Sequence, residues 1–407
     1  MRANRSLAYI TTYLTAISLM LAIASGCWSR REIETLGFVM ALGIDSLPSG
    51  KLQVTAHFAK PGALGGGDQK ASQEKPFWVS SAEGDTVLDA FRNLGSISPK
   101  RPYLPHNRFY LFGESLLREI GILPVIDFLS RNSEPRLTAQ IVVAKGATAR
   151  DLLQAEFSDT AMPSESAQKI MLYLHSTRGT IPEITLREFQ DRVESEGIEP
   201  IALGAELTRL EPDISIEGEL TRKEIKSTAR LGGTAIFKGN YLVGWLDDLE
   251  TRGLNWVLGK VKGAQVVFPQ PGFEDKLATV EILRSSSKFK VEVQEGKIRA
   301  NVEIDTVGNL GCVQEPVDLV KQPEIWTQLE KGLQKAIKDE VMHTAAKLQQ
   351  IGADAIGFGQ NIFRRKPKEW AKLKDQWDEM FPTVEVHVKV KASLRTTGMV
   401  MKSVETK

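Results

Sequence analysis

Residues 384–395 read Val-Glu-Val-His-Val-Lys-Val-Lys-Ala-Ser-Leu-Arg, with apolar residues at every second position and polar residues between them. Because successive side chains of a strand point to opposite faces of a sheet, this alternation predicts a strand with one face in a core and the other in water. The residue types over 278–284, 288–293 and 298–304 predict three more strands, the last two joined by a turn at residues 295–296.

Two helix patterns lie between these strands. The second opens at Pro367 and carries Trp370, Leu373 and Trp377 at spacings of three and four. The first begins at Pro323, stops at Gly352, and has one apolar stripe made of Trp326, Leu329, Leu333, Ile337, Val341, Ala345 and Leu348. We therefore expect a C-terminal α+β domain over residues 269–407. It should consist of an antiparallel sheet covered on one face by two helices, with Trp370 and Trp377 in the core.

The residues before this domain predict two more units. Strand and helix patterns alternate irregularly over residues 27–199, which favours a mixed α/β domain over a doubly wound sheet. Residues 200–268 predict a small middle domain: a hairpin of residues 230–237 and 241–245, then a helix capped by Asp247 or Asp248. The expected fold class is thus α+β or mixed α/β, with a three-domain body.

The N-terminus has the order of a lipoprotein signal peptide. Arg2 and Arg5 precede a largely apolar run over residues 7–23, and Ala24-Ser25-Gly26 then precede Cys27. Residues 1–26 are expected to be removed, and the thiol of Cys27 to be joined to a diacylglycerol, with or without a further N-acyl chain of the palmitate type. The alternative is an uncleaved signal-anchor helix, because the run is near the lower limit of about 17 residues for crossing a bilayer.

Net charge and cysteine content limit the possible partners and the possible disulfides of this protein. The chain of 407 residues has a net charge of +1, and removal of Arg2 and Arg5 leaves −1, so no nucleic-acid partner is indicated. If Cys27 carries lipid, Cys312 has no intrachain partner and is expected to be a small buried apolar residue. No later stretch approaches 18 unbroken apolar residues, which places the body outside the membrane.

No catalytic, cofactor or metal motif is legible. The five histidines stand far apart, and none belongs to a His-x-x-His, His-Glu-x-x-His or Cys-x-x-Cys arrangement. No Walker loop, Gly-x-Ser-x-Gly elbow or Gly-x-Gly-x-x-Gly fingerprint is present. We therefore expect that the protein is not an enzyme and has no catalytic, cofactor-binding or metal-binding residues. The covalent lipid on Cys27 is the only attached group that we expect.

Several segments resemble one family, the Ger(x)C spore germination lipoproteins, which are the C subunits of germinant receptors. The opening resembles theirs at residues 26–34 and at Leu42-Gly43-Ile44-Asp45. The later segments that carry the resemblance are residues 106–114, 127–132, 233–237, 244–246, 250–253, 367–370, Trp377, 381–382 and 384–395. They follow one another in order along nearly the whole mature chain.

The resemblance implies an accessory subunit, lipid-anchored to the outer face of the spore inner membrane and needed for the germination response to small nutrients. Its implied partners are membrane lipid and the polytopic A and B subunits of the receptor. It implies a three-domain α/β body, and of the family's functional residues only the lipidated cysteine maps here, onto Cys27. No tight small-molecule ligand is expected of this subunit.

Two other readings stay open at this level. A solute-binding lipoprotein of a membrane importer is the main alternative, although such proteins usually have two similar lobes and a flexible tether. Here only about eight charged and polar residues separate Cys27 from the first apolar run at Leu36. A lipid-anchored hydrolase is the third reading, which the lack of a nucleophile motif disfavours.

Overall fold

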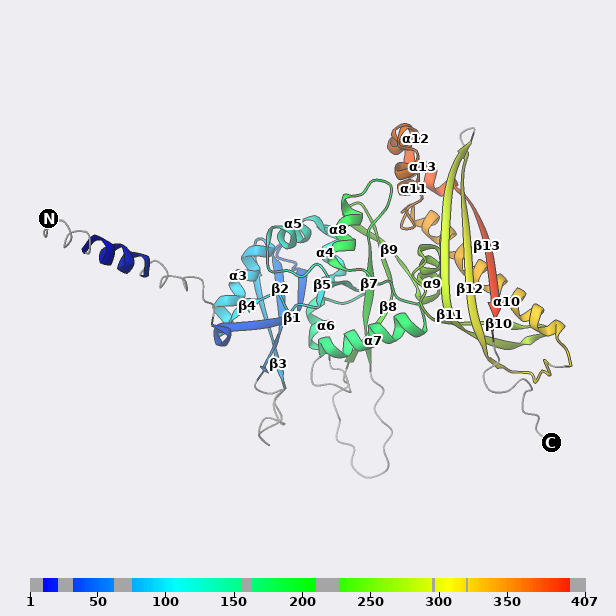
Figure 1. Ribbon diagram of the computed structural model, residues 1–407, viewed down its shortest axis with the longest axis horizontal. Helices are drawn as coiled ribbons and strands as arrows, with labels where there is room; N and C mark the ends of the chain where they lie inside the picture. Colours follow the sequence, from blue (N-terminus) through cyan, green and yellow to red (C-terminus); the bar gives the residue numbers. More distant parts are fainter. Residues whose placement is uncertain are drawn as a thin grey trace, which may run out of the picture.

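The computed structural model describes residues 10–20, 32–61, 75–155, 163–209, 227–294, 297–319 and 321–395. Cys27 and the Gly-rich residues 62–74 lie outside these residues. Residues 10–20 form a helix with exposed side chains, which Figure 1 shows well away from the remaining elements. None of the described helices combines the length and apolarity that crossing a bilayer requires.

Among the described residues, nine strands form a first, mixed sheet. Its order is β3-β2-β1-β5-β6-β7-β8-β9, with the short β4 beside β1. The central pairs β1–β5, β5–β6 and β6–β7 are parallel, and hairpins flank them on both sides. The strands are β1 Leu36–Ser46, β2 Leu52–Ala59, β3 Phe77–Gly84, β4 Arg101–Tyr103, β5 Phe109–Gly113, β6 Gln140–Ala144, β7 Ile201–Arg209, β8 Ser227–Lys238 and β9 Tyr241–Leu246.

Both faces of the first sheet are buried at β5 and β6, which explains why these strands are apolar apart from Gln140 at the start of β6. In β5, Tyr110 and Phe112 pack in the larger core, whereas Phe109 and Leu111 pack in a smaller core on the other face. The helices around this sheet are α3 Val87–Ile97, α4 Glu114–Glu119, α5 Leu123–Arg131, α6 Ala149–Gln154, α7 Pro163–Thr177 and α8 Leu186–Glu194. α6 and α7 contribute residues to the smaller core.

The segment expected to form a middle domain is divided between the two sheets. The predicted hairpin is present as β8 and β9, but it completes the first sheet, because β7 pairs with β6 on one side and with β8 on the other. The predicted helix is α9 (Asp248–Leu258), and its cap is Asp247. The expected boundary at residue 199 therefore falls inside a continuous sheet, and residues 200–268 do not form a sheet of their own.

The second sheet has the order β10-β11-β12-β13. Its strands are β10 Ala264–Gln270, β11 Phe273–Gln294, β12 Lys297–Val313 and β13 Glu385–Leu394. The strands expected at residues 278–284 and 288–293 are one continuous strand, β11. It pairs antiparallel with β10 and β12, whereas β13 lies parallel to β12, against the expected antiparallel sheet. The reason is α10 (Glu324–Ile351): a helix of 28 residues, about 42 Å long, returns the chain to the start of β12.

The helical cover of this sheet agrees with the sequence in its main parts. α10 buries its predicted stripe from Leu329 to Leu348 and contacts β10 and β13, while the alternate residues of β13 on the other face are exposed. The predicted core positions of Trp370 and Trp377 are confirmed, at 4% and 6% exposure. The remaining helices are α11 Phe358–Arg365, which contacts β11, α12 Pro367–Leu373, which packs on α11, and α13 Trp377–Met380.

Cys312 is exposed, so the expectation of a buried residue is wrong. Even-numbered residues of β12 point into the core as far as Leu310, and the same alternation would bury Cys312. A bulge interrupts it: Val280 pairs with Leu310 but Thr279 pairs with Cys312. The extra residue shifts the register and turns the thiol to the other face of the sheet.

Candidate functional site at the helix that joins the sheets

Helix α9 connects the last strand of the first sheet to the first strand of the second. Figure 1 shows it between the two sheets, and it contacts β8 in the first sheet and β11 and α10 in the second. Its residues from Glu250 to Val257 are all buried, including three charged or amide side chains. Buried polar groups in a short helix need hydrogen-bond partners.

The start of α9 is set by a capping box. The side chain of Asp247 accepts a hydrogen bond from the Glu250 backbone N–H at 2.8 Å, and the Glu250 carboxylate accepts one from the Asp247 N–H at 2.8 Å. One residue further, the Thr251 and Thr234 hydroxyls share a buried hydrogen bond of 2.8 Å. Thr234 belongs to β8, so this bond ties the first turn of α9 to the first sheet.

The next residue, Arg252, ties α9 to the second sheet. Its guanidinium donates from Nε to Glu340 Oε2 at 3.0 Å, from Nη2 to Glu340 Oε1, and from Nη1 to the Gln265 carbonyl at 2.8 Å. Trp256 Nε1 also donates to Glu340 Oε2, at 2.9 Å. The Arg252 and Glu340 side chains are only 8% and 15% exposed, so this is a buried, fork-shaped ion pair.

Gly253 lets α9 and α10 approach closely. A Cβ atom at this position would lie 2.0 Å from Thr344 Oγ1 and 2.6 Å from the Glu340 carbonyl oxygen. Thr344 Oγ1 is itself 2.9 Å from the carbonyl oxygens of Glu250 and Glu340. Residues 250–253 thus form one contact surface on which every position has a partner in another element.

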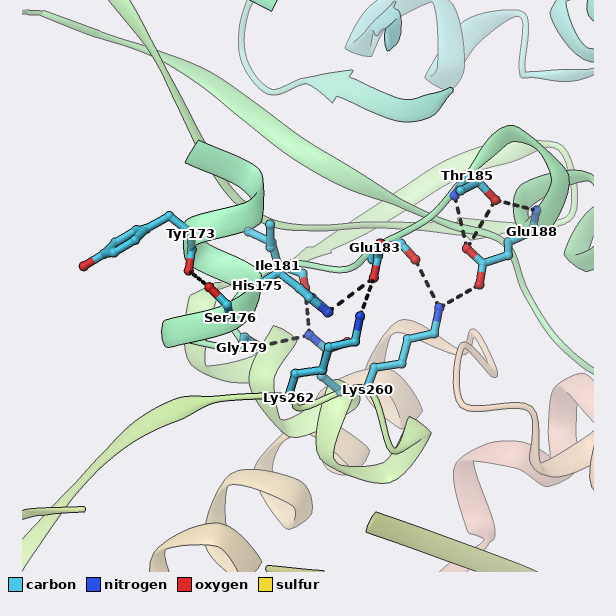
Figure 2. Close-up of polar contacts among 11 residues, drawn as sticks. Tyr173, His175, Ser176, Gly179, Ile181, Glu183, Thr185, Glu188, Lys260 and Lys262 are labelled. Atoms are coloured by element: carbon cyan, nitrogen blue, oxygen red, sulfur yellow. Dashed lines mark hydrogen bonds and ion pairs between the residues drawn. The ribbon is translucent and has the colours of Figure 1, made fainter. Parts of the chain in front are cut away.

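The other end of α9 meets the helices that cover the first sheet (Figure 2). Asn255 Nδ2 donates to the carbonyl oxygens of Gly179 and Ile181, at 2.9 and 2.8 Å. After the helix ends at Gly259, Lys260 Nζ donates to the Glu183 carbonyl oxygen at 3.1 Å and to Glu188 Oε1 at 3.0 Å. These contacts join α9 to the segment between α7 and α8.

Electrostatics at this end are balanced by opposite charges. Burial opposes ionisation of Glu188, but the hydrogen bonds from Lys260 and Thr185 outweigh it, so the pKa of Glu188 is lowered. His175 Nε2 lies 3.3 Å from Glu183 Oε2, and Lys262 Nζ lies 3.5 Å from the same oxygen. Burial lowers the pKa of His175, and the nearby lysines add to this effect against the attraction of Glu183.

A second polar contact joins the sheets near α12. Arg192 at the end of α8 donates to the carbonyl oxygens of Glu199 and Ala355, at 2.9 and 3.0 Å, and burial lowers its pKa to about 10. Burial likewise raises the pKa of Asp354 to about 6, although its carboxylate accepts three backbone N–H groups over residues 357–359. Trp370 Nε1 donates to Glu196 Oε2 at 2.5 Å.

The polar groups of this junction form structural contacts between the two sheets. Its carboxylates accept from cations and N–H groups that hold them in place, and the Ser176 hydroxyl donates to the Tyr173 carbonyl oxygen instead of to His175 (Figure 2). In the described part of the chain, no group of three or more His, Cys, Asp or Glu side chains is placed to hold a metal ion. The junction fixes the two sheets relative to each other.

Cys27, the one site residue predicted from the sequence, is not part of this junction. Cys27 lies outside the described residues. The junction was missed because its partners are far apart in the chain: Arg252 and Glu340 are separated by 88 residues. The available signal was a run of four residues, 250–253, that carries two charges yet directly precedes the apolar part of a helix.

Both parts of the chain are similar to known proteins. The chain matches the family description "Spore germination protein N-terminal domain" over residues 29–206 and "Spore germination B3/ GerAC like, C-terminal" over residues 232–398. The chain belongs to the Ger(x)C family of spore germination proteins. The family's C-terminal unit thus includes β9, most of β8 and α9, so the first sheet is built from both units.

Individual relatives match over nearly the whole length. The chain is 27% identical over 393 residues to "Spore germination protein KC" of Bacillus subtilis (strain 168), covering 95% of this chain and 96% of that protein. It is 26% identical over 386 residues to "Spore germination protein B3" of the same organism, covering 94% and 97%. Among solved structures, the GerBC protein has the same fold, with a TM-score of 0.53, 21% identity, and coverage of 89% of this chain and 99% of that one.

Proposed function

We propose that this protein is the lipid-anchored accessory C subunit of a spore germinant receptor, and that it is not an enzyme. The observation that carries the proposal is the end-to-end likeness to spore germination proteins, through both family units and 95% of the chain. In this proposal the body sits on the extracytoplasmic face of the spore inner membrane and contacts the polytopic A and B subunits.

The junction at α9 supports a role in assembly. Two sheets joined through a buried ion pair and a close helix contact hold their outer surfaces at fixed positions, as a subunit with several partners requires. Partners confined to the same membrane meet at high effective concentration, so each contact is sufficient even when weak. We accordingly expect amino acids and sugars to bind the isolated body no better than millimolar, about −4 kcal/mol.

Anchoring is tested at the two cysteines of the chain. Cys27→Ala should abolish incorporation of labelled lipid and release the protein from spore membranes, because an attached diacylglycerol supplies the two chains that stable anchoring needs. Cys312→Ala is the matched control: it removes an exposed thiol and should leave labelling unchanged. Equal labelling of the Cys27→Ala variant and the parent would contradict the anchoring.

Assembly is tested by purification from spore membranes in mild detergent. A tagged parent chain should retain polytopic membrane proteins, and the Cys27→Ala variant should retain less of them. If calorimetry instead finds micromolar binding of an amino acid or sugar to the isolated body, and no membrane protein is retained, the solute-binding lipoprotein of an importer is the better assignment.

A further inference from the structure

A small cavity lies on the face of the first sheet that α6 and α7 cover. Its volume is about 50 Å³, and its apolar lining comes from both the sheet and the two helices. Phe109 and Leu111 of β5 and Leu231 of β8 line it from the sheet, and Leu152 lines it from α6.

Two polar side chains, His57 of β2 and Ser164 of α7, also line this cavity. They are 1% and 4% exposed. Among the described residues, neither the two ring nitrogens of His57 nor the Ser164 hydroxyl has a hydrogen-bond partner. The His57 ring is held from one side by Phe77, with 4.6 Å between the ring centroids. Folded proteins rarely leave three such buried atoms unsatisfied, so these two residues indicate a bound group.

The lining decides the chemistry of that group. Among the residues that the structure describes, no lysine, arginine, aspartate or glutamate lines the cavity, so a charged ligand would meet no counter-charge from them. Burial lowers the pKa of His57 to about 4, and its imidazole is therefore neutral at pH 7, with one nitrogen that donates and one that accepts. The volume admits about three to five water molecules, or an organic molecule of about three or four non-hydrogen atoms, since an apolar cavity that holds benzene has about 150 Å³.

We propose that this cavity binds a small neutral molecule with a hydrocarbon body and one hydroxyl or carbonyl group, held by hydrogen bonds to His57 and Ser164. The hydrocarbon part would contact Phe109, Leu111 and Leu152, while the polar group meets the imidazole. Zwitterionic amino acids and sugars do not fit this lining, because they bring charges or several hydroxyls to an apolar wall. The inference does not depend on the receptor function proposed above.

2-Propanol is a suitable probe because it has four non-hydrogen atoms and one hydroxyl. In protein labelled with ¹⁵N-histidine, titration with 2-propanol should shift the ring-nitrogen signals of His57 to saturation. The signals of His387, whose side chain is 57% exposed, should stay in place. Isopropylammonium, which has the same hydrocarbon body and a positive charge, should produce no saturable shift.

Two variants separate binding from folding. His57→Leu should weaken 2-propanol binding at least tenfold, as measured by the signal changes in the titration. Ala167→Leu adds bulk to the cavity wall from α7, leaves His57 in place, and should abolish the shift while the circular dichroism spectrum stays unchanged. Absence of a His57 shift in the parent would mean that only water fills the cavity, and an equal response to isopropylammonium would mean non-specific partition; either result overturns the proposal.

Discussion

Replacing Glu340 with alanine removes the acceptor that holds three N–H groups at the junction. In the parent, its carboxylate accepts from Arg252 Nε at 3.0 Å, from Arg252 Nη2, and from Trp256 Nε1 at 2.9 Å. Without it, a guanidinium that is only 8% exposed keeps one protein acceptor, the Gln265 carbonyl oxygen. The variant therefore leaves a buried cation without its counter-charge and a buried indole N–H without its acceptor.

Breaking a buried pair in this way costs about 3–5 kcal/mol of unfolding free energy. Glu340→Gln keeps the shape and one acceptor oxygen but loses the charge, so we expect a smaller loss of about 2 kcal/mol. The matched control is Asp339→Ala, which breaks the neighbouring pair with Lys335 on the same helix. That pair has side chains 59% and 80% exposed and should contribute at most about 0.5 kcal/mol.

Urea unfolding followed by circular dichroism measures the three losses. At a slope of about 3 kcal/mol per M, Glu340→Ala should lower the midpoint by about 1–1.7 M, and Asp339→Ala should leave it nearly unchanged. The reasoning is refuted if Glu340→Ala unfolds within about 1 kcal/mol of Asp339→Ala. In that event solvent reaches Arg252 and the junction is not a dry contact.

Three further outcomes follow from burial. Gly253→Ala should destabilise the protein by several kcal/mol, because the new Cβ would lie 2.0 Å from a hydroxyl oxygen of α10. Gly95→Ala, which has open space around the new Cβ, should stabilise the protein by about 0.5–1 kcal/mol in the same urea assay. Trp370→Ala and Trp377→Ala should each cost about 3–5 kcal/mol, and unchanged melting temperatures would mean that these indoles are exposed. Because the folded pKa of His57, about 4, lies below its unfolded value near 6.5, the unfolded chain binds the extra proton, and stability should fall by up to about 3 kcal/mol as the pH drops from 6.5 to 4. The stability difference between the parent and His57→Gln across this pH range isolates that contribution, and a difference that does not change with pH would contradict it.

The secondary structure of this protein was predictable where a local period is strong. The alternation over residues 384–395 and the stripe from Leu329 to Leu348 each repeat within a few residues, and both elements are present. The same holds for the Asp247 cap, whose partner is three residues away. The family was recognisable for a related reason, since short segments in a constant order survive at 27% identity.

The pairing of strands was not predictable from those patterns, because a period states which side chains share a face and not which strand lies alongside. The strand pairing that crosses the expected boundary at residue 199 and the wrong direction of β13 both have this cause. Cys312 shows the same limit on a smaller scale: one extra residue in β12 reversed its face, and a bulge leaves no mark in the alternation itself.

The sequence by itself determined the elements, the apolar faces, the family and the candidate anchor at Cys27, since each of these is encoded in neighbouring residues. Only the tertiary structure decided the junction and the cavity. From sequence alone, Arg252 is a charged residue of a helix, and only the fold places Glu340 against it. His57 is likewise one polar position in a strand, and only the fold encloses it with β5, α6 and α7. Both depend on desolvation by distant segments, which burial creates and local sequence does not record.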